Sequence, residues 1–127
     1  MSPRSLAALA LLVGACGGAP VDDEVAPGAT ASYVTDAGRA RVDVKYPDAG
    51  IVRGVNRFRL RPAEGSGVTS LRATMLAHGH HVAGALSPDG DATIAEVELV
   101  MPGQWELSAG VRTGAGDDTL RFSFVVP

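Results

Sequence analysis

Alternation of apolar and polar residues dominates the sequence after about residue 40. Segments with a period of two recur at intervals of roughly 8 to 12 residues, which is typical of short β-strands. Glycine, proline and aspartate turn signals separate these segments, and none of them has the period of an amphipathic helix. Strands with one apolar and one polar face bury the apolar face by packing two sheets together. The sequence therefore predicts an all-β fold, an immunoglobulin-like antiparallel β-sandwich of six to seven strands.

The first 15 residues have the pattern of a bacterial lipoprotein signal peptide. Arg4 supplies a short positive start, residues 6–13 form an apolar run, and small residues precede Cys16. In such a signal, a diacylglyceryl group is attached to the cysteine, which becomes the mature N-terminus. The run is too short for a transmembrane helix, which needs about 20 residues. We expect residues 1–15 to be removed and Cys16 to be lipidated; an ordinary secretory signal with an incidental Cys16 is the alternative.

Residues 16–32 are expected to be the lipidated cysteine and a flexible tether. The stretch after Cys16 consists largely of Gly, Ala, Pro, Asp and Glu and has no apolar periodicity. Gly17 follows the cysteine in place of the aspartate that is associated with inner-membrane retention, which favours the outer membrane. The expected location is the periplasmic face of the bacterial cell envelope, with the membrane as a partner through the lipid. The folded domain is then expected over residues 33–127.

Composition excludes several classes of function. The chain carries 11 basic and 14 acidic side chains, a net charge of −3, so no nucleic-acid partner is expected. Cys16 is the only cysteine, so no disulfide can stabilise the domain. Ser66 lies between two glycines but in no nucleophile elbow, and the glycines of residues 114–116 precede no helix that could bind phosphate. We therefore expect no enzymatic activity.

The first two expected strands lie before the middle of the chain. Residues 41–46 alternate around two valines and a tyrosine, and a Pro-Asp-Ala-Gly turn follows. Residues 56–61 direct Phe58 and Leu60 inward and three arginines outward. A solvated sheet face that discourages aggregation is the favoured interpretation of these arginines, and an anionic partner is the alternative.

Five further strands complete the sandwich. They are expected over residues 71–75, 82–86, 93–100, 104–111 and 118–126. Trp105 shares one face of its strand with three aliphatic side chains, and it is the largest apolar side chain of the sequence. Core packing is therefore expected of Trp105, in preference to stacking on a ligand.

All three histidines lie within four positions, at the end of the strand that carries Met75. In extended backbone, His78 and His80 would project to the same side with Cα atoms about 6.6 Å apart, at a rise of about 3.3 Å per residue. His81 would point the other way unless Gly79, which tolerates positive φ, bends the chain. Met75 has a different parity from His78 and His80, so it joins them only if the strand bends or bulges.

The donor chemistry of this cluster favours copper. Imidazole suits zinc, copper and nickel, and a thioether adds a preference for Cu(I). No thiolate and no carboxylate lie nearby in the sequence, so the segment lacks the ligands for a closed structural zinc site. Met101, in a turn between strands, is a candidate second thioether. Two alternatives stay open, namely exposed loop histidines beside a methionine that fills the core, and a pH sensor.

Several short motifs resemble one known family. They are Met75-Leu76-Ala77-His78-Gly79-His80, then Pro88-Asp89-Gly90, then Met101-Pro102-Gly103-Gln104-Trp105-Glu106-Leu107, and earlier Gly54-Val55-Asn56-Arg57-Phe58. Together they resemble the YtkA-like domain, a relative of the FixH group, over about residues 38–126. The resemblance implies an immunoglobulin-like sandwich on the outer side of the cytoplasmic membrane.

The resemblance also implies a copper function, because FixH-type relatives are linked to copper supply for cbb-type cytochrome oxidases. By that analogy Met75, His78, His80 and Met101 are the copper ligands. This chain departs from the family in three respects: relatives often carry a Met-Pro-x-Met run where Leu76 and Ala77 stand here, His81 is an addition, and no membrane helix is expected.

Two hypotheses about function follow. In the first, a lipid-anchored envelope protein binds copper through Met75, His78, His80, His81 and Met101, and delivers it to a copper-accepting envelope protein or buffers it. In the second, the domain is a metal-free β-sandwich interaction module that docks through a sheet edge or a loop.

Overall fold

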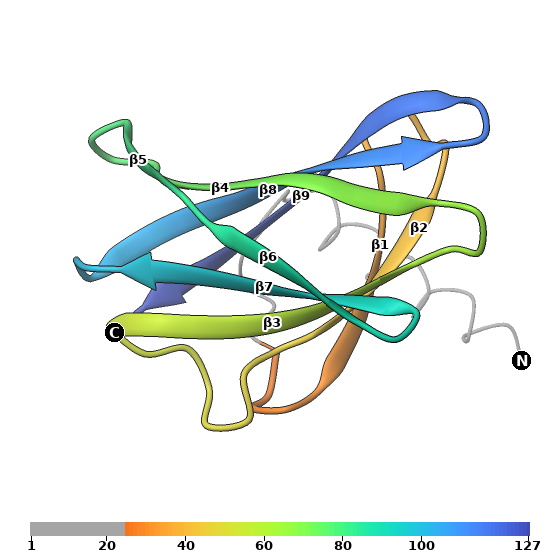
Figure 1. Cartoon of the computed structure of the whole chain (residues 1–127). Coiled ribbons are helices and arrows are strands. Elements are labelled where there is room, and N and C mark those ends of the chain that lie inside the picture. Colours follow the sequence, from red (N-terminus) through yellow and green to blue (C-terminus); the bar gives the residue numbers. More distant parts are fainter. Residues whose placement is uncertain (1–24) are drawn as a thin grey trace, which may run out of the picture.

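The computed structural model describes residues 25–127, which form nine antiparallel β-strands and no helix (Figure 1). The strands are β1 (Thr30–Val34), β2 (Arg41–Lys45), β3 (Gly54–Pro62), β4 (Gly67–Met75), β5 (His80–Ala83), β6 (Ala85–Asp89), β7 (Ala92–Leu99), β8 (Gly103–Thr113) and β9 (Gly116–Val126). The all-β prediction is confirmed, with nine strands where six to seven were expected. Over the same residues, the chain contains no helix that is long and apolar enough to cross a membrane.

Two sheets make up the sandwich. The first has the order β1-β2-β3-β7-β6 and the second has the order β5-β4-β8-β9. The orders β2-β3-β7-β6 and β4-β8-β9 reproduce the two sheets of an immunoglobulin domain. β1 extends the first sheet at one edge, and β5 extends the second sheet beside β4. The predicted immunoglobulin-like sandwich is therefore present, with a strand added to each sheet.

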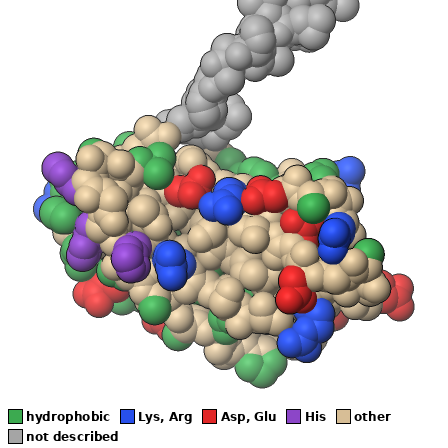
Figure 2. All heavy atoms as spheres, turned by 90° about the horizontal axis from the view of Figure 1, so that it is seen from above, with side chains coloured by type: hydrophobic (Ala, Val, Ile, Leu, Met, Phe, Trp, Pro, Cys, Tyr) green, Lys and Arg blue, Asp and Glu red, His purple; other side chains and the backbone are tan. Residues whose placement is uncertain are grey.

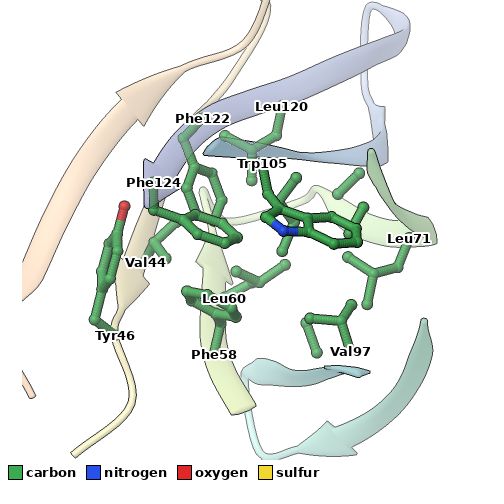
Figure 3. Close-up of a cluster of buried hydrophobic side chains, with 14 of the residues drawn as sticks. Val44, Tyr46, Phe58, Leu60, Leu71, Val97, Trp105, Leu120, Phe122 and Phe124 are labelled. Carbon is green, nitrogen blue, oxygen red and sulfur yellow. The ribbon is translucent and has the colours of Figure 1, made fainter. Parts of the chain in front are cut away.

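The core lies between the sheets and is centred on aromatic rings. Trp105 on β8 and Phe58 on β3 are fully buried, and Phe122 and Phe124 on β9 pack against Phe58 at ring-centroid distances of 5.5 Å each (Figure 3). Every second residue of the long strands is buried, as the alternation of the sequence predicted. The interpretation of Trp105 as a core residue is confirmed.

One strand occupies part of the expected tether. β1 begins at Thr30 and pairs with β2. The Tyr33 ring stacks on Phe122 with centroids 5.0 Å apart, and its hydroxyl lies 2.7 Å from that of Tyr46. The folded domain thus starts before the expected boundary at residue 33, because tertiary contacts of Tyr33 order a segment whose own sequence lacks strong alternation. The expected signal peptide and Cys16 lie outside the described residues.

The single strand expected over residues 82–86 is two strands in different sheets. β5 pairs with β4, and β6 pairs with β7. Gly84 lies between them, where the chain crosses from one sheet to the other. A Cβ at Gly84 would lie 2.3 Å from a methyl of Leu71 and 2.7 Å from a methyl of Val97. Only glycine fits this crossing, since the backbone passes directly over core side chains.

Asp118 joins the two sheets near the opposite edge. Its carboxylate, on β9, accepts hydrogen bonds from the hydroxyl of Thr35 at 2.6 Å and from the amides of Ala37 and Arg39 at 2.9 and 3.0 Å. Partial desolvation raises the pKa of Asp118, but these hydrogen bonds and one from the amide of Thr119 outweigh it and hold the pKa well below its usual range. The turn after β1 is thereby fixed to the second sheet.

The outward arginines of β3 are paired with acidic side chains. Arg57 lies 3.9 Å from Glu96, Arg59 lies 2.8 Å from Asp89, and Arg61 lies 3.8 Å from Asp91. These pairs are exposed and each contributes little to stability. Such pairing favours the solvated sheet face over the anionic partner.

We predict that Gly84→Ala destabilises the domain by about 1–3 kcal/mol, because the new methyl overlaps Leu71 and Val97 in a packed core. Urea unfolding measures the change. Gly114→Ala is the matched control, since a Cβ there meets nothing within 4 Å. Equal unfolding midpoints for the two variants would contradict the packing account of Gly84.

The pKa of Asp118 predicts a pH-dependent contribution to stability. Because the folded pKa lies below the ordinary value of 3.8, Asp118 stabilises the fold fully above about pH 5 and loses this effect as the pH falls below 3.8. Asp118→Asn should therefore unfold more readily than wild type at pH 7, and the gap should close in acid. The exposed neighbour Asp117 is the control, and Asp117→Asn should show no such gap.

Candidate metal centre

A tight hairpin carries the histidines. β4 ends at Met75, residues 76–79 form the turn, and β5 begins at His80. The amide of Gly79 donates to the carbonyl of Met75 at 2.8 Å, and Gly79 has a φ of 68°. Gly79 therefore bends the chain, and the bend is a complete reversal of direction.

This reversal changes the expected relation between the histidines. His78 lies in the turn, so the same-side spacing that extended backbone would give His78 and His80 does not apply. In the register of the hairpin, Met75 is opposite His80, and Thr74 is opposite His81. Residues directly opposite in an antiparallel pair share one face, with Cβ atoms about 4.5–5.5 Å apart. Met75 and His80 thus share a face although their parity along the sequence differs, and His81 lies on the other face.

The shared face of Met75 and His80 is the inner face of the second sheet. Met75 is opposite Trp105 on β8, and Trp105 is opposite Phe124 on β9, so a row of side chains crosses the whole sheet. The His80 ring packs edge-on to Trp105, with centroids 6.3 Å apart and planes at 78°. Met75 is 6% exposed, while His80 at the end of the row is exposed. The row therefore leads from the core to the surface at His80.

The turn that carries Met101 lies at the same end of the sandwich. The indole N–H of Trp105 donates to the carbonyl of Met101 at 2.9 Å. A Cβ placed on Gly103 would lie 3.1 Å from the methyl carbon of Met75, so the thioether of Met75 reaches toward the start of β8. Met101 itself is 37% exposed. The fold thus brings the turn of Met101 to the same end as Met75 and His80.

The histidines do not form a site by themselves. Among residues 25–127, no three His, Cys, Asp or Glu side chains come together as a group that could hold a metal ion. All three histidines are exposed and gather at one end of the domain (Figure 2). His80 supplies an imidazole, which suits copper among other metals, and Met75 supplies a soft thioether, which adds a preference for Cu(I). The donor chemistry present fits copper, and His78 and His81 flank the pair.

Two neighbours of the cluster were not expected from the sequence. Trp105 contacts His80, and Glu106 shares the outer face of the second sheet with Thr74 and His81. Glu106 lies 3.6 Å from Arg121, so it already has a cationic partner. No local signal places either residue near the histidines, because both positions depend on the pairing of β4 with β8.

A hollow of about 710 Å³ lies away from the histidines, beside the turn between β3 and β4. Its charged lining residues are Arg41, Asp43, Arg61, Glu64 and Asp91. Because both signs of charge are mixed and Arg61 already faces Asp91, this hollow selects no class of ligand. The histidine end remains the candidate site.

No protein-family model, curated protein or solved structure matches this chain. The resemblance to the YtkA-like domain therefore stays a prediction from the sequence.

We predict that Gly79→Ala lowers the stability by about 1 kcal/mol, since a Cβ is disfavoured at positive φ. Amide exchange in β5 should become faster, because the turn sets the pairing of His80 with Met75. Gly67→Ala is the control, as Gly67 has neither positive φ nor neighbours for a Cβ. Equal β5 exchange in both variants would mean that the turn does not position His80.

Proposed function

We propose that this protein is a lipid-anchored protein of the bacterial cell envelope that binds copper, for delivery to a copper-accepting envelope protein or for buffering. The observation that carries the proposal is the cross-strand pairing of Met75 with His80, beside the turn of Met101. It places an exposed imidazole next to a thioether, which is the donor combination expected for Cu(I).

The primary ligands in this proposal are His80 and Met75. His80 gives copper access from solvent, while Met75 approaches from the core side, where Trp105 excludes water. Met101 is the second thioether, and exposed His78 is a nearby imidazole for the transfer of copper to a partner. His81 lies on the opposite face of the hairpin, so in this proposal it contributes little to copper binding.

The histidine end of the domain offers fewer suitable ligands for zinc than for copper. Cys16 lies outside the described residues, and the carboxylate of Glu106, which is next to His81 on the outer face of the second sheet, is paired with Arg121. Structural zinc sites need four protein ligands that leave no coordination position open, and these ligands usually include thiolates. Soft thioethers beside imidazole therefore favour copper over zinc.

The anchor is supported by the N-terminal pattern of the sequence, which ends at Cys16. Lipid chains on that cysteine hold the protein firmly at a membrane without a spanning helix. Gly17 favours delivery to the outer membrane, with the domain on the periplasmic side.

A metal-free interaction module is the second candidate. One observation favours it: Leu76, Val100 and Met101 are exposed apolar residues beside the histidines. Apolar side chains grouped at a surface are typical of docking sites.

Copper titration of the mature chain tests the proposal. Cys16→Ala removes the free thiol of the unlipidated chain, and Cu(I) is then expected to bind one to one. His80→Ala and Met75→Leu should each weaken binding at least about tenfold, or about 1.4 kcal/mol. Trp105 is the only tryptophan, so its fluorescence should report binding beside His80.

His81→Ala is the matched control and should bind copper nearly as wild type does. Isotherms that are indistinguishable for wild type, His80→Ala and Met75→Leu would contradict copper binding at this site and leave the metal-free module.

A further inference from the structure

Exposed apolar side chains are concentrated at one end of the domain. Seven large hydrophobic residues in the described part of the chain are exposed, and six of them form what we call the apolar end. They are Val52, Val55, Leu76, Val100, Met101 and Val125, and each is between 37% and 58% exposed. The seventh, Val34, is the last residue of β1.

Strand register places these six residues at one end of the sandwich, with Val55 and Val125 on the outer faces of opposite sheets. Val52 and Val55 flank the start of β3, where Gly54 is opposite Leu99, and Val100 and Met101 follow Leu99 directly. In the second sheet, the amide of Leu76 donates to the carbonyl of Gln104, and Gln104 is opposite Val125. The start of β3 and the end of β7 therefore lie at the same end of the sandwich as the end of β4 and the end of β9 (Figure 1), and the histidines gather at this end (Figure 2).

The apolar end is held in shape. The amide of buried Asn56 donates to the carbonyl of Val52 at 2.7 Å, and its side-chain oxygen accepts from the Val52 amide at 2.9 Å. The Trp105 indole fixes the turn of Met101 in the same way. Hydrogen bonds from buried side chains therefore hold Val52 and the turn of Met101 at the surface.

The chain enters the domain beside the apolar end. The amide of Gly28 donates to the carbonyl of Pro47 at 2.9 Å, and a Cβ on Gly50 would lie 3.4 Å from Pro27. The loop of Pro47 and Gly50 continues through Val52 into β3. Val25, the first described residue, is nine residues from Cys16, so the extended chain between them spans at most about 32 Å.

Size and charge decide what covers this surface. A stable protein interface uses about 20–30 residues a side, far more than six apolar side chains and their neighbours supply. Arg53, which directly follows Val52, and Glu98, which is opposite Val55, are exposed charges of opposite sign that offset each other. A surface without net charge that lies at most a short tether from a bilayer fits the apolar boundary of that bilayer.

We propose that the apolar end docks onto the lipid bilayer that holds Cys16. The inference rests on the lipid anchor of the proposed function and is independent of copper. Six partly exposed apolar side chains bind a membrane weakly from solution, but the tether keeps the bilayer within reach and so raises its effective concentration. The domain then lies with the turns of Leu76 and Met101 against the lipid and with the Thr35–Arg39 turn away from it.

Amide hydrogen exchange on vesicles tests this orientation. The mature chain is coupled through Cys16 to a maleimide lipid in vesicles of phosphatidylethanolamine and phosphatidylglycerol, and Cys16→Ser in solution is the reference. Amides of residues 76–79 and of Val100 and Met101 should exchange at least about tenfold more slowly on the vesicle. Amides of the Thr35–Arg39 turn should be unchanged. Because Arg53 and Glu98 offset each other, 0.5 M salt should leave the protection in place.

Matched variants separate the possible results. Leu76→Ser combined with Val100→Ser should abolish the protection, and Val34→Ser should retain it. Protection that is absent, equal at both ends, or reproduced without vesicles at high protein concentration overturns the proposal, the last result indicating a second copy of the chain. Since the coupling is chemical and copper is left out, failure here is distinct from failure of the copper or lipidation proposals.

Discussion

The burial of Trp105 is the constraint on which the histidine end of the domain depends. An indole that is fully buried must place its N–H against an acceptor, and the carbonyl of Met101 supplies it. That hydrogen bond fixes the turn between β7 and β8 over the core. The same ring lies between Phe124 and Met75 in the row that ends at His80. One core side chain thus positions both the thioether turn and the imidazole.

Connections between the sheets hold this arrangement in place. At one edge, the chain crosses from β5 to β6 at Gly84, where a side chain would overlap the core. The hairpin of His80 thereby continues into the first sheet. At the other edge, Asp118 and Tyr33 attach the segment around β1 to β9. Cys16 is the only cysteine, so no disulfide within the chain can join the two sheets. Packing, hydrogen bonds and the crossing at Gly84 join them instead, where many exported β-sandwiches have a disulfide.

The residues proposed for copper binding and those proposed for membrane docking lie at the same end of the molecule. In the copper proposal Met75 and His80 provide the donors, and the exposed apolar side chains of Leu76, Val100 and Met101 belong to the same end of the domain. A copper site that lies close to a membrane faces partners that are confined to the same membrane, which shortens the search for an acceptor. The exposed position of His80 at the sheet edge keeps one route to the metal open to such a partner.

Local alternation in the sequence determined most of the fold, because strand period and turn residues are properties of neighbouring positions. It missed β1, whose order comes from the contacts of Tyr33 with Phe122 and Tyr46, and it merged β5 with β6, because the crossing at Gly84 is visible only when Leu71 and Val97 lie beneath it. The sequence also identified Met75, His78, His80, His81 and Met101 as candidates by residue type. Only the tertiary structure decided that Met75 faces His80, that His81 is turned away, and that Trp105 and Met101 belong to the same end. Those relations depend on a turn conformation and on strand register between distant segments, which no local pattern specifies.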